Sequence, residues 1–254
     1  MTRVIKVGGR PQSDPLLPAA VAAGWDRANG GVVLVHGGGD EVTALQRALG
    51  VPSTFVDGRR VTTAEDLDLV RMALSGSANK RLVASLVASG VDAVGLSGED
   101  AALIAATPMD AGRLGHVGVP GRVNVAFLRH LLSGGYLPVI SPVSANGTAD
   151  SGGALNVNGD DAAAAIAIAL RAAELLLVAD VEGVMRDGRR IPCLTPADAR
   201  ELLADGTAVG GMRAKLQAAL AALEGGVARV RISDVAAIAD PGRGTSLQKF
   251  GDLS

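Results

Sequence analysis

The stretch Val4-Ile5-Lys6-Val7-Gly8-Gly9 decides how this 254-residue chain is organised. Its β-branched run predicts a buried strand. The two glycines let the backbone turn and let another group approach the amides at the strand's end. A lysine inside such a strand is costly to bury unless an anion pairs with it, although Lys6 could also extend past an ordinary turn into water. The stretch thus predicts one cation and several bare amides directed at one place.

The composition indicates a globular protein of one large domain or two lobes, with 48% hydrophobic residues, 20% charged residues and a net charge of −2. The near-zero charge argues against a nucleic-acid surface. No apolar run approaches the roughly 20 residues of a membrane helix, and no signal peptide precedes the first strand. The single Cys193 excludes an internal disulfide and a cysteine-rich metal site. We therefore expect a cytoplasmic protein that binds neither nucleic acid nor membrane.

Lysine is rare in this chain, because only four of the 24 basic residues are lysines. The lysine ammonium is a compact point charge, whereas the arginine guanidinium is wide and planar. The four lysines are therefore candidates for sites where a guanidinium does not fit. Lys80 is expected to face solvent or a partner subunit, and Lys249 near the tail has no assigned role. Lys6 and Lys215 are the lysines that accompany glycine-rich turns.

A second buried strand, residues 32–35, runs into His36-Gly37-Gly38-Gly39-Asp40 and then into a helix that ends near Leu49. A strand, a glycine-rich turn and a helix together present exposed amides and the positive end of a helix to an anion. The turn is not a P-loop, because no G-x-x-x-x-G-K-[S/T] motif occurs in the sequence. We expect it to hold a phosphate or a carboxylate.

The segment that follows predicts a hairpin with its turn at Asp57-Gly58. It presents Arg59 and Arg60 on opposite faces, and either guanidinium can bind a carboxylate with two bonds. Thr63 is expected to cap a helix that ends near Leu74. Gly76 is expected to break this helix, after which a new helix starts at residue 78.

Four polar residues precede the apolar helix at residues 162–170, namely Asn156, Asn158, Asp160 and Asp161. A helix cap needs only one of them. Polar groups in excess of a cap at the start of a buried helix indicate a functional site. A carboxylate at this place could hold lysine side chains in position or bind Mg²⁺.

The second half repeats the pattern of a strand followed by a turn rich in amides. A buried strand at residues 174–179 leads into Asp180-Val181-Glu182-Gly183, and open α/β sheets bind ligands at such strand ends. Gly210-Gly211 precedes a long helix that carries Lys215 about one turn inside it. The order of strands and helices predicts a mostly parallel sheet with helices on both faces. Two facing anion sites with a lysine each suit phosphoryl transfer, which requires positioning and cations around the developing charge.

Nine motifs, in this order and over nearly the whole chain, resemble the amino acid kinase family, and within it the branch that acts on N-acetyl-L-glutamate. The motifs are Lys6-Val7-Gly8-Gly9, Val35-His36-Gly37-Gly38-Gly39, Asp57-Gly58-Arg59-Arg60-Val61-Thr62, Gly76-Ser77-Ala78-Asn79-Lys80, Leu114-Gly115-His116-Val117-Gly118, Gly135-Tyr136-Leu137-Pro138-Val139, Asn156-Val157-Asn158-Gly159-Asp160, Asp180-Val181-Glu182-Gly183-Val184 and Gly211-Met212-Arg213-Ala214-Lys215. Each motif alone is weak, whereas the set is specific.

The resemblance implies a three-layer αβα sandwich with a mostly parallel central sheet, like that of carbamate kinase. Residues 1–172 would form the acyl-amino-acid-binding lobe, which also makes a homodimer, and residues 173–254 the nucleotide-binding lobe. The implied enzyme moves the γ-phosphoryl group of ATP to the side-chain carboxylate of N-acetyl-L-glutamate, the second step of arginine biosynthesis. Mg²⁺ would bind through the ATP phosphates, without a metal site of protein ligands.

The resemblance also implies the roles of individual residues. Lys6 and Lys215 would neutralise the transferring group from opposite sides, while Asp160 holds both ammonium groups in position. The amides of Gly8, Gly9 and Gly38 would bind phosphoryl oxygens. The residues that would hold the acylated amino acid are Gly38, Gly39, Arg60 and Asn156. The residues that would line the nucleotide are Asp180, Val181, Glu182, Gly183, Val184, Met185, Thr207, Ala208 and Val209.

Three positions depart from the family's pattern. Gly159 stands where alanine is usual, Glu99 where lysine or a neutral residue is common, and Gly210 where an acidic residue is frequent. The chain also begins directly at its first strand, whereas the arginine-inhibited hexameric members carry an extra N-terminal helix. We therefore expect a dimer that arginine does not inhibit, and a hexamer in light scattering would contradict this expectation.

Two other functions fit the same residues. A sister kinase that phosphorylates an aminoadipyl or glutamyl group on an acidic carrier protein would show a basic rim at the acceptor mouth, to which Arg59, Arg113 and Arg122 could contribute. A ligand sensor without catalysis would be expected to lack a lysine or the aspartate of the catalytic set, yet Lys6, Lys215 and Asp160 are all present. An aspartate kinase is less favoured, because the chain has no room for the regulatory domain that such enzymes usually carry.

Overall fold

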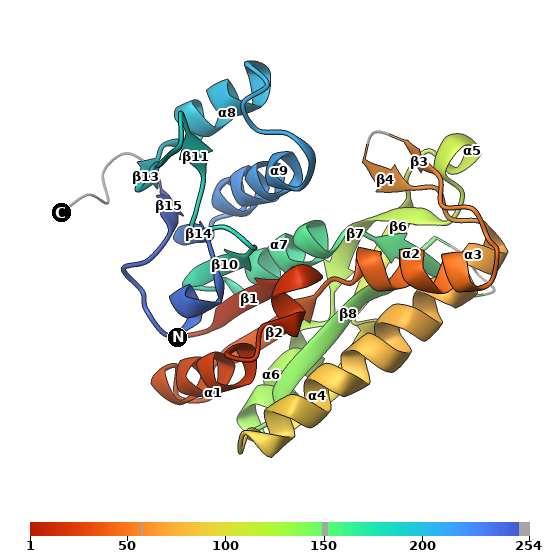
Figure 1. Cartoon of the computed structure of the whole chain (residues 1–254). Coiled ribbons are helices and arrows are strands. Elements are labelled where there is room, and N and C mark those ends of the chain that lie inside the picture. Colours follow the sequence, from red (N-terminus) through yellow and green to blue (C-terminus); the bar gives the residue numbers. More distant parts are fainter. Residues whose placement is uncertain (57, 149–151, 249–254) are drawn as a thin grey trace.

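A computed structural model describes residues 1–56, 58–148 and 152–248. Its centre is an 11-stranded sheet in the order β13-β15-β14-β10-β1-β2-β8-β6-β7-β9, with β5 paired to β8 (Figure 1). The strands are β1 Arg3–Val7, β2 Val32–His36, β5 Ala93–Gly98, β6 Ile104–Pro108, β7 Val117–Val123, β8 Leu137–Asn146, β9 Ala154–Val157, β10 Glu174–Val178, β13 Cys193–Leu194, β14 Arg229–Ser233 and β15 Thr245–Leu247.

The middle of the sheet is parallel, as predicted, because β1 pairs in parallel with both β2 and β10, and β10 pairs in parallel with β14. Antiparallel pairing is confined to the two flanks, where β6 pairs with β7, β8 with β9, and β14 with β15. Parallel strands covered on both faces are apolar along their whole length. Every residue of β2 and β10 is accordingly buried.

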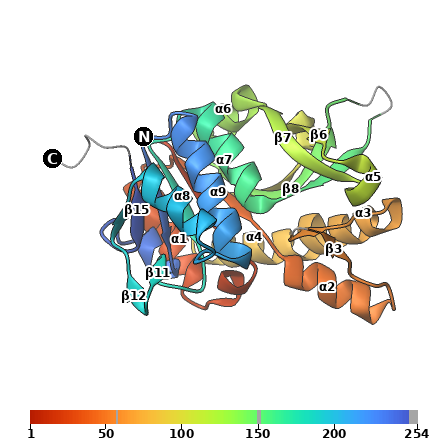
Figure 2. The same ribbon diagram turned by 90° about the horizontal axis from the view of Figure 1, so that it is seen from above.

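Helices cover both faces of the sheet, which gives three layers (Figures 1 and 2). The face that carries α7 and α9 packs against one hydrophobic cluster, and the face that carries α1 and α4 packs against another. The helices are α1 Leu17–Arg27, α2 Gly39–Ala48, α3 Ala64–Val70, α4 Asn79–Ala88, α5 Ala111–Leu114, α6 Val125–Ser133, α7 Gly159–Leu170, α8 Pro196–Ala204 and α9 Gly210–Glu224, with short 3-10 helices at Arg10–Ser13, Asp100–Ala102 and Val235–Ile238.

Alternation along β1 decides where its lysine points. Val4 belongs to the cluster beneath α7 and α9, while Ile5 and Val7 belong to the cluster beneath α1 and α4. Successive side chains of a strand point to opposite faces, so Lys6 shares the face of Val4 and points toward α7. The strand that opens the chain therefore delivers its cation to the start of the most apolar helix.

Two small hairpins stand outside the central sheet. One pairs β3, Phe55–Val56, with β4, Arg59–Arg60, as the sequence predicts. Gly58 has a φ of +77°, which suits the predicted turn, while Asp57 lies outside the described residues. The other pairs β11, Met185–Arg186, with β12, Arg189–Arg190. The β3–β4 hairpin stands on the side of the molecule that carries α2 and α3 (Figure 1).

Two predicted boundaries are wrong. Gly76 does not break a helix, because residues 71–78 form a π-helix, η2, that joins α3 to α4. The polar composition of residues 144–153 predicts a loop, but strand β8 continues to Asn146; residues 149–151 lie outside the described residues. No helix within the described residues has the length and apolarity needed to cross a membrane.

Candidate active site

The predicted catalytic residues converge on one buried carboxylate, that of Asp160. The Nζ of Lys6 lies 2.9 Å from its Oδ1, and the Nζ of Lys215 lies 3.4 Å from its Oδ2. The three side chains come from β1, α7 and α9, and all are buried. The structure thus assembles the predicted triad from residues that lie far apart in the sequence.

Asp160 reaches this position because α7 begins directly before it. Asn158 is the N-cap, and its Oδ1 accepts hydrogen bonds from the backbone N–H of Asp160 and of Asp161. Helix N-termini favour negative charge, so the first turn of α7 suits both aspartates. Gly159 leaves room for the lysine, since an added Cβ would lie only 3.2 Å from the Cε of Lys6. The departure from the family's alanine therefore has a steric counterpart in this chain.

The charges of the triad stabilise one another against burial. Burial alone would raise the pKa of Asp160, but the two ammonium groups outweigh it and hold that pKa below its usual value. Burial and the neighbouring Lys6 lower the pKa of Lys215. Two cations share one carboxylate, so the cluster carries an excess positive charge that an anionic ligand would neutralise.

The glycine-rich turn after β2 lies against the end of β1. Gly38 has a φ of +145°, and an added Cβ would lie 2.7 Å from Leu74 Cδ2, so only glycine fits there. The amides of Gly9 and Gly38 donate to no acceptor among the described residues. Gly8 differs from the expectation, because its N–H donates to the carbonyl of Val178 at 3.2 Å.

His36, at the end of β2, orients this turn. Its Nδ1 lies 2.8 Å from the carbonyl oxygen of Gly37, and its Nε2 lies 3.1 Å from the amide nitrogen of Asn79. The carbonyl of Gly37 can only accept and the amide nitrogen of Asn79 can only donate, so Nδ1 carries the proton and Nε2 accepts. Burial lowers the pKa of His36 to about 4. A neutral histidine therefore holds the backbone on which Gly38 depends.

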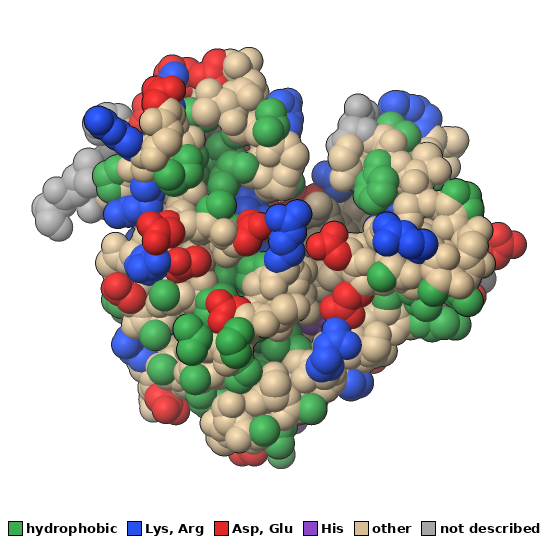
Figure 3. All heavy atoms as spheres, viewed as in Figure 1, with side chains coloured by type: hydrophobic (Ala, Val, Ile, Leu, Met, Phe, Trp, Pro, Cys, Tyr) green, Lys and Arg blue, Asp and Glu red, His purple; other side chains and the backbone are tan. Residues whose placement is uncertain are grey.

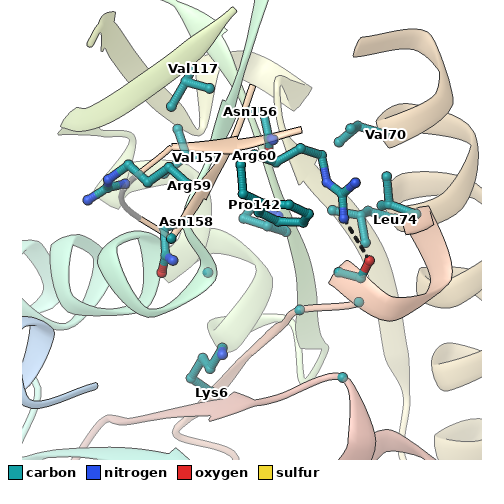
Figure 4. A pocket seen from close by; sticks show the side chains of 18 residues that line it. Lys6, Arg59, Arg60, Val70, Leu74, Val117, Pro142, Asn156, Val157 and Asn158 are labelled. Carbon is teal, nitrogen blue, oxygen red and sulfur yellow. Dashed lines mark hydrogen bonds between the residues drawn. The ribbon is translucent and has the colours of Figure 1, made fainter. Parts of the chain in front are cut away.

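A pocket of about 240 Å³ opens on one side of the triad (Figure 4). It is lined by the predicted acceptor residues Gly38, Gly39, Arg60 and Asn156, together with Lys6. The predicted acceptor set is thus assembled around one cavity, and one lysine of the triad reaches into it.

Arg60 is held at the wall of this pocket by neutral groups. It donates to Gln46, to Ser53 Oγ at 3.2 Å, and through Nη2 to the Gly39 carbonyl at 3.0 Å and to Thr43 Oγ1 at 2.8 Å. Burial lowers the pKa of Arg60. No carboxylate among the described residues forms an ion pair with it, which leaves its charge available to an anionic ligand. The carboxylate that Arg60 was expected to bind would have to meet a guanidinium already engaged on both terminal nitrogens.

A second pocket, of about 400 Å³, opens on the other side of the triad. Lys215 lines it, together with Gly8 and the predicted nucleotide residues Asp180 and Val181. The space-filling view shows the molecule hollowed between the part that carries α8 and α9 and the part that carries α2 and the β3–β4 hairpin (Figure 3). Gly9 and Gly39 line both pockets, so the two cavities meet at the glycine turns.

Other predicted nucleotide residues do not line this second pocket. They are Glu182, Gly183, Val184, Met185, Thr207, Ala208 and Val209. Val184 is buried and donates its N–H to Thr245 Oγ1 at 2.8 Å, and Val209 is exposed at the start of α9. Sequence reasoning missed Arg10, which lines the pocket and pairs with Asp180 at 2.7 Å. Its position directly after the first glycine pair was the available signal.

The remaining departures and rim residues take other positions. Glu99 is absent from the pocket lining and pairs with Arg71 at 2.7 Å. Arg59 turns toward α7 and pairs with Asp161 rather than standing free on a basic rim. Arg113 pairs with Asp110 at 3.4 Å.

Gly210 is the first residue of α9 and has a φ of +51°. Within the described residues, no group of three or more His, Cys, Asp or Glu side chains could hold a metal ion.

Comparisons with known proteins agree with this geometry. The sequence profile of the amino acid kinase family matches residues 1–234. An acetylglutamate kinase from Chloroflexus aurantiacus is 46% identical over 241 residues, which is 94% of either chain. A solved Streptococcus mutans protein superposes with a TM-score of 0.87 at 27% identity, covering 97% of this chain and 98% of that one.

A further solved structure is an N-acetylglutamate synthase from Neisseria gonorrhoeae, in complex with coenzyme A and N-acetyl-glutamate. It superposes with a TM-score of 0.82 at 29% identity. The match covers 100% of this chain and 60% of the synthase chain. The family profile spans the triad, the glycine turns and both pockets. The chain belongs to the amino acid kinase family.

Proposed function

We propose that this protein transfers the γ-phosphoryl group of ATP to the side-chain carboxylate of N-acetyl-L-glutamate, giving N-acetyl-L-glutamyl 5-phosphate in arginine biosynthesis. The observation that carries the proposal is the placement of two pockets on either side of one buried carboxylate, with one lysine in each pocket. The acetylglutamate kinases among its relatives support the choice of acceptor.

In this mechanism the smaller pocket holds the acceptor and the larger pocket holds ATP. The side-chain carboxylate of the acceptor attacks the γ-phosphorus, and the bond from that phosphorus to the β,γ-bridging oxygen breaks, which releases ADP. Lys6 from the acceptor side and Lys215 from the nucleotide side neutralise the charge that develops on the phosphoryl oxygens. Asp160 keeps both ammonium groups in place, and the free amides of Gly9 and Gly38 add hydrogen bonds to those oxygens.

The same geometry supports roles for the remaining residues. Arg60 would supply the positive wall that holds a carboxylate of the acceptor, beside the Asn156 side chain, which donates to Thr62 Oγ1 at 3.0 Å. Asp180 and Val181 would line the phosphates of the nucleotide. Mg²⁺ would enter bound to those phosphates and would supply further neutralisation of their charge.

The division into lobes is proposed in a revised form. All residues that line the proposed acceptor pocket precede residue 172. The nucleotide pocket, however, draws Gly8, Gly9 and Asp40 from the first part and Asp180 and Lys215 from the second. ATP would therefore lie between the lobes rather than within residues 173–254 alone. We also propose a homodimer, which light scattering would test and which a monomer or hexamer would contradict.

Trapping of the acyl phosphate with hydroxylamine tests the proposed reaction. N-Acetyl-L-glutamate, L-glutamate, N-acetyl-L-aminoadipate and L-aspartate are offered side by side with ATP and Mg²⁺. The proposal expects hydroxamate with N-acetyl-L-glutamate in clear preference to the others. Turnover with none of the four while ATP still binds would favour a carrier-linked acceptor, and an absence of ATP binding would favour a sensor; either result would overturn the proposed acceptor.

A further inference from the structure

The β3–β4 hairpin forms one wall of the acceptor pocket, although it lies outside the central sheet. Phe55, Gly58 and both arginines of β4 line the cavity. Its two strands have two residues each and pair with each other. A hairpin of this size is not stable by itself, so contacts with its surroundings must hold it against the pocket.

The two arginines leave β4 toward opposite sides of the pocket (Figure 4). Arg60 reaches the first turns of α2, through Gly39 and Thr43. Arg59 reaches the first turn of α7, where its Nη2 lies 3.0 Å from Asp161 Oδ2. The hairpin is thus tied to two different helices, one on each side of the acceptor cavity.

The contact with α7 has features of a specific ion pair. Both side chains are mostly buried, with 27% and 25% of their surface exposed. Burial raises the pKa of Asp161 despite its guanidinium partner, so this carboxylate is poorly solvated and depends on Arg59. The other terminal nitrogen of Arg59, Nη1, is buried without a partner among the described residues. A buried donor without a partner weakens the folded state, which argues against a purely stabilising role for this arginine.

Asp161 is also the residue that follows Asp160, and Asn158 caps the amides of both. A contact with Asp161 therefore fixes the hairpin relative to the helical turn that orients Lys6 and Lys215. Pairing of Arg59 with Asp161 sets the distance between the wall of the acceptor pocket and the lysines.

We propose that Arg59 and Asp161 form a clamp that positions the β3–β4 hairpin over the acceptor and thereby sets acceptor affinity. Both are positioning residues, and neither neutralises the transferring phosphoryl group. The consequence for kinetics rests on the proposed function. The consequence for the hairpin does not, because the clamp is a contact of the ligand-free chain.

The kinetic test uses Arg59→Gln, Asp161→Asn and the double variant. Each single variant is expected to raise the KM for the acceptor about tenfold, with kcat and the KM for ATP within about twofold of the parent. The double variant is expected to resemble either single variant, because the second substitution removes a contact already lost. An unchanged acceptor KM, or effects of the two substitutions that multiply, would overturn the clamp.

A second readout requires no activity. Trypsin cleaves after arginine, and Asp161→Asn keeps both arginines of the hairpin while releasing the clamp. We expect cleavage after Arg59 and Arg60 to become about tenfold faster in this variant without any ligand. The matched control is Glu224→Gln, which breaks the exposed pair of Arg200 and Glu224 between α8 and α9 and should leave hairpin cleavage unchanged. Equal cleavage rates in Asp161→Asn and the parent would overturn the clamp, even if the parent proved inactive toward the proposed acceptor.

Discussion

Two buried carboxylates lie toward opposite ends of the same parallel strands and have opposite surroundings. Asp160, at the carboxyl end, faces the ammonium groups of Lys6 and Lys215. Glu174, at the amino end, faces guanidinium groups of three arginines, and two of these are its register partners on β1 and β14. The three arginines are Arg3, Arg229 and Arg231.

Two arginines of this cluster, Arg3 and Arg231, have little hydrogen-bonding capacity left. Arg3 places Nε at 2.8 Å and Nη2 at 2.7 Å from one oxygen of Glu174, and Arg231 places Nε at 2.6 Å from the other. The remaining nitrogens of Arg231 donate to backbone carbonyls. The guanidinium groups of Arg3 and Arg231 are engaged by the protein and tie β1, β10 and β14 together, whereas Arg229, with 40% of its side chain exposed, also lines an open cavity.

The lysine cluster is open. Each ammonium group has three donors, contacts Asp160 with one side and lines a pocket with the other. The comparison teaches that a buried ion cluster stabilises the fold or serves chemistry according to the donors that it leaves free. It also gives a physical reason for the rarity of lysine, since two of the four lysines in the chain meet at one carboxylate.

The largest effect on stability is expected from Glu174→Gln. This substitution leaves three guanidinium groups without their buried anion, and the loss of one partner of a buried ion pair costs about 3–5 kcal/mol. Denaturant unfolding measures the change in the free energy of unfolding, and kcat of the folded fraction should match that of the parent. A change below about 1 kcal/mol would show that the arginine cluster does not hold the strands together.

Acid should act first on the carboxyl end of the sheet, through His36. Burial lowers its pKa from 6.5 to about 4, so the unfolded chain binds the proton more readily than the folded chain. The free energy of unfolding therefore falls as the pH drops from 6.5 to about 4, by on the order of 3 kcal/mol. The stabilising contribution of Asp160 persists through this window, because its pKa lies below the usual value of 3.8, whereas that of Glu174 begins to fall below its usual pKa of 4.5.

Urea unfolding at about pH 7 and about pH 5 measures this slope in the parent and in His36→Gln. The variant should show a weaker dependence on pH over this range, because it lacks the titrating group. An identical slope in the two proteins would mean that another group controls acid stability.

The smallest effect on the free energy of unfolding is expected from an exposed ion pair, which serves as a contrast to the two buried clusters. Arg200 and Glu224 lie 2.7 Å apart with more than half of each side chain exposed. Solvent screens such a pair, so Arg200→Ala should change the free energy of unfolding by less than about 1 kcal/mol. A loss of unfolding free energy as large as that of Glu174→Gln would contradict the claim that burial decides how much an ion pair contributes to stability.

The sequence predicted features that depend on local patterns. The β-branched run and the glycines that follow it located β1, and the excess of polar residues before an apolar helix marked Asp160. Thr63 caps its helix as predicted, and its side chain accepts a hydrogen bond from the backbone N–H of Asp66. The family resemblance then supplied the pairing of Lys6 and Lys215 with one carboxylate.

Features that depend on the register of distant segments were not predictable from the sequence. Glu174 meets Arg3 only because β1 and β10 are neighbours, and Arg59 meets Asp161 across 102 residues. The Gly8 N–H is not free for a ligand because it donates to the carbonyl of Val178, a contact that also depends on the pairing of β1 with β10. Gly76 misled the helix prediction because η2 continues through it and places Leu74 against Gly38. Tertiary packing there overrides the weak helix propensity of glycine.

An exchange of cations between the two clusters tests the central claim most directly. Turnover and the free energy of unfolding are measured in the same preparations of Lys215→Arg and Arg231→Lys. The account predicts that Lys215→Arg stays folded but loses about 10²–10³-fold in kcat, because a fork cannot occupy the point of the ammonium. It predicts that Arg231→Lys keeps its kcat and loses about 2 kcal/mol of stability with its hydrogen bonds. A Lys215→Arg variant with the turnover of the parent would contradict the account.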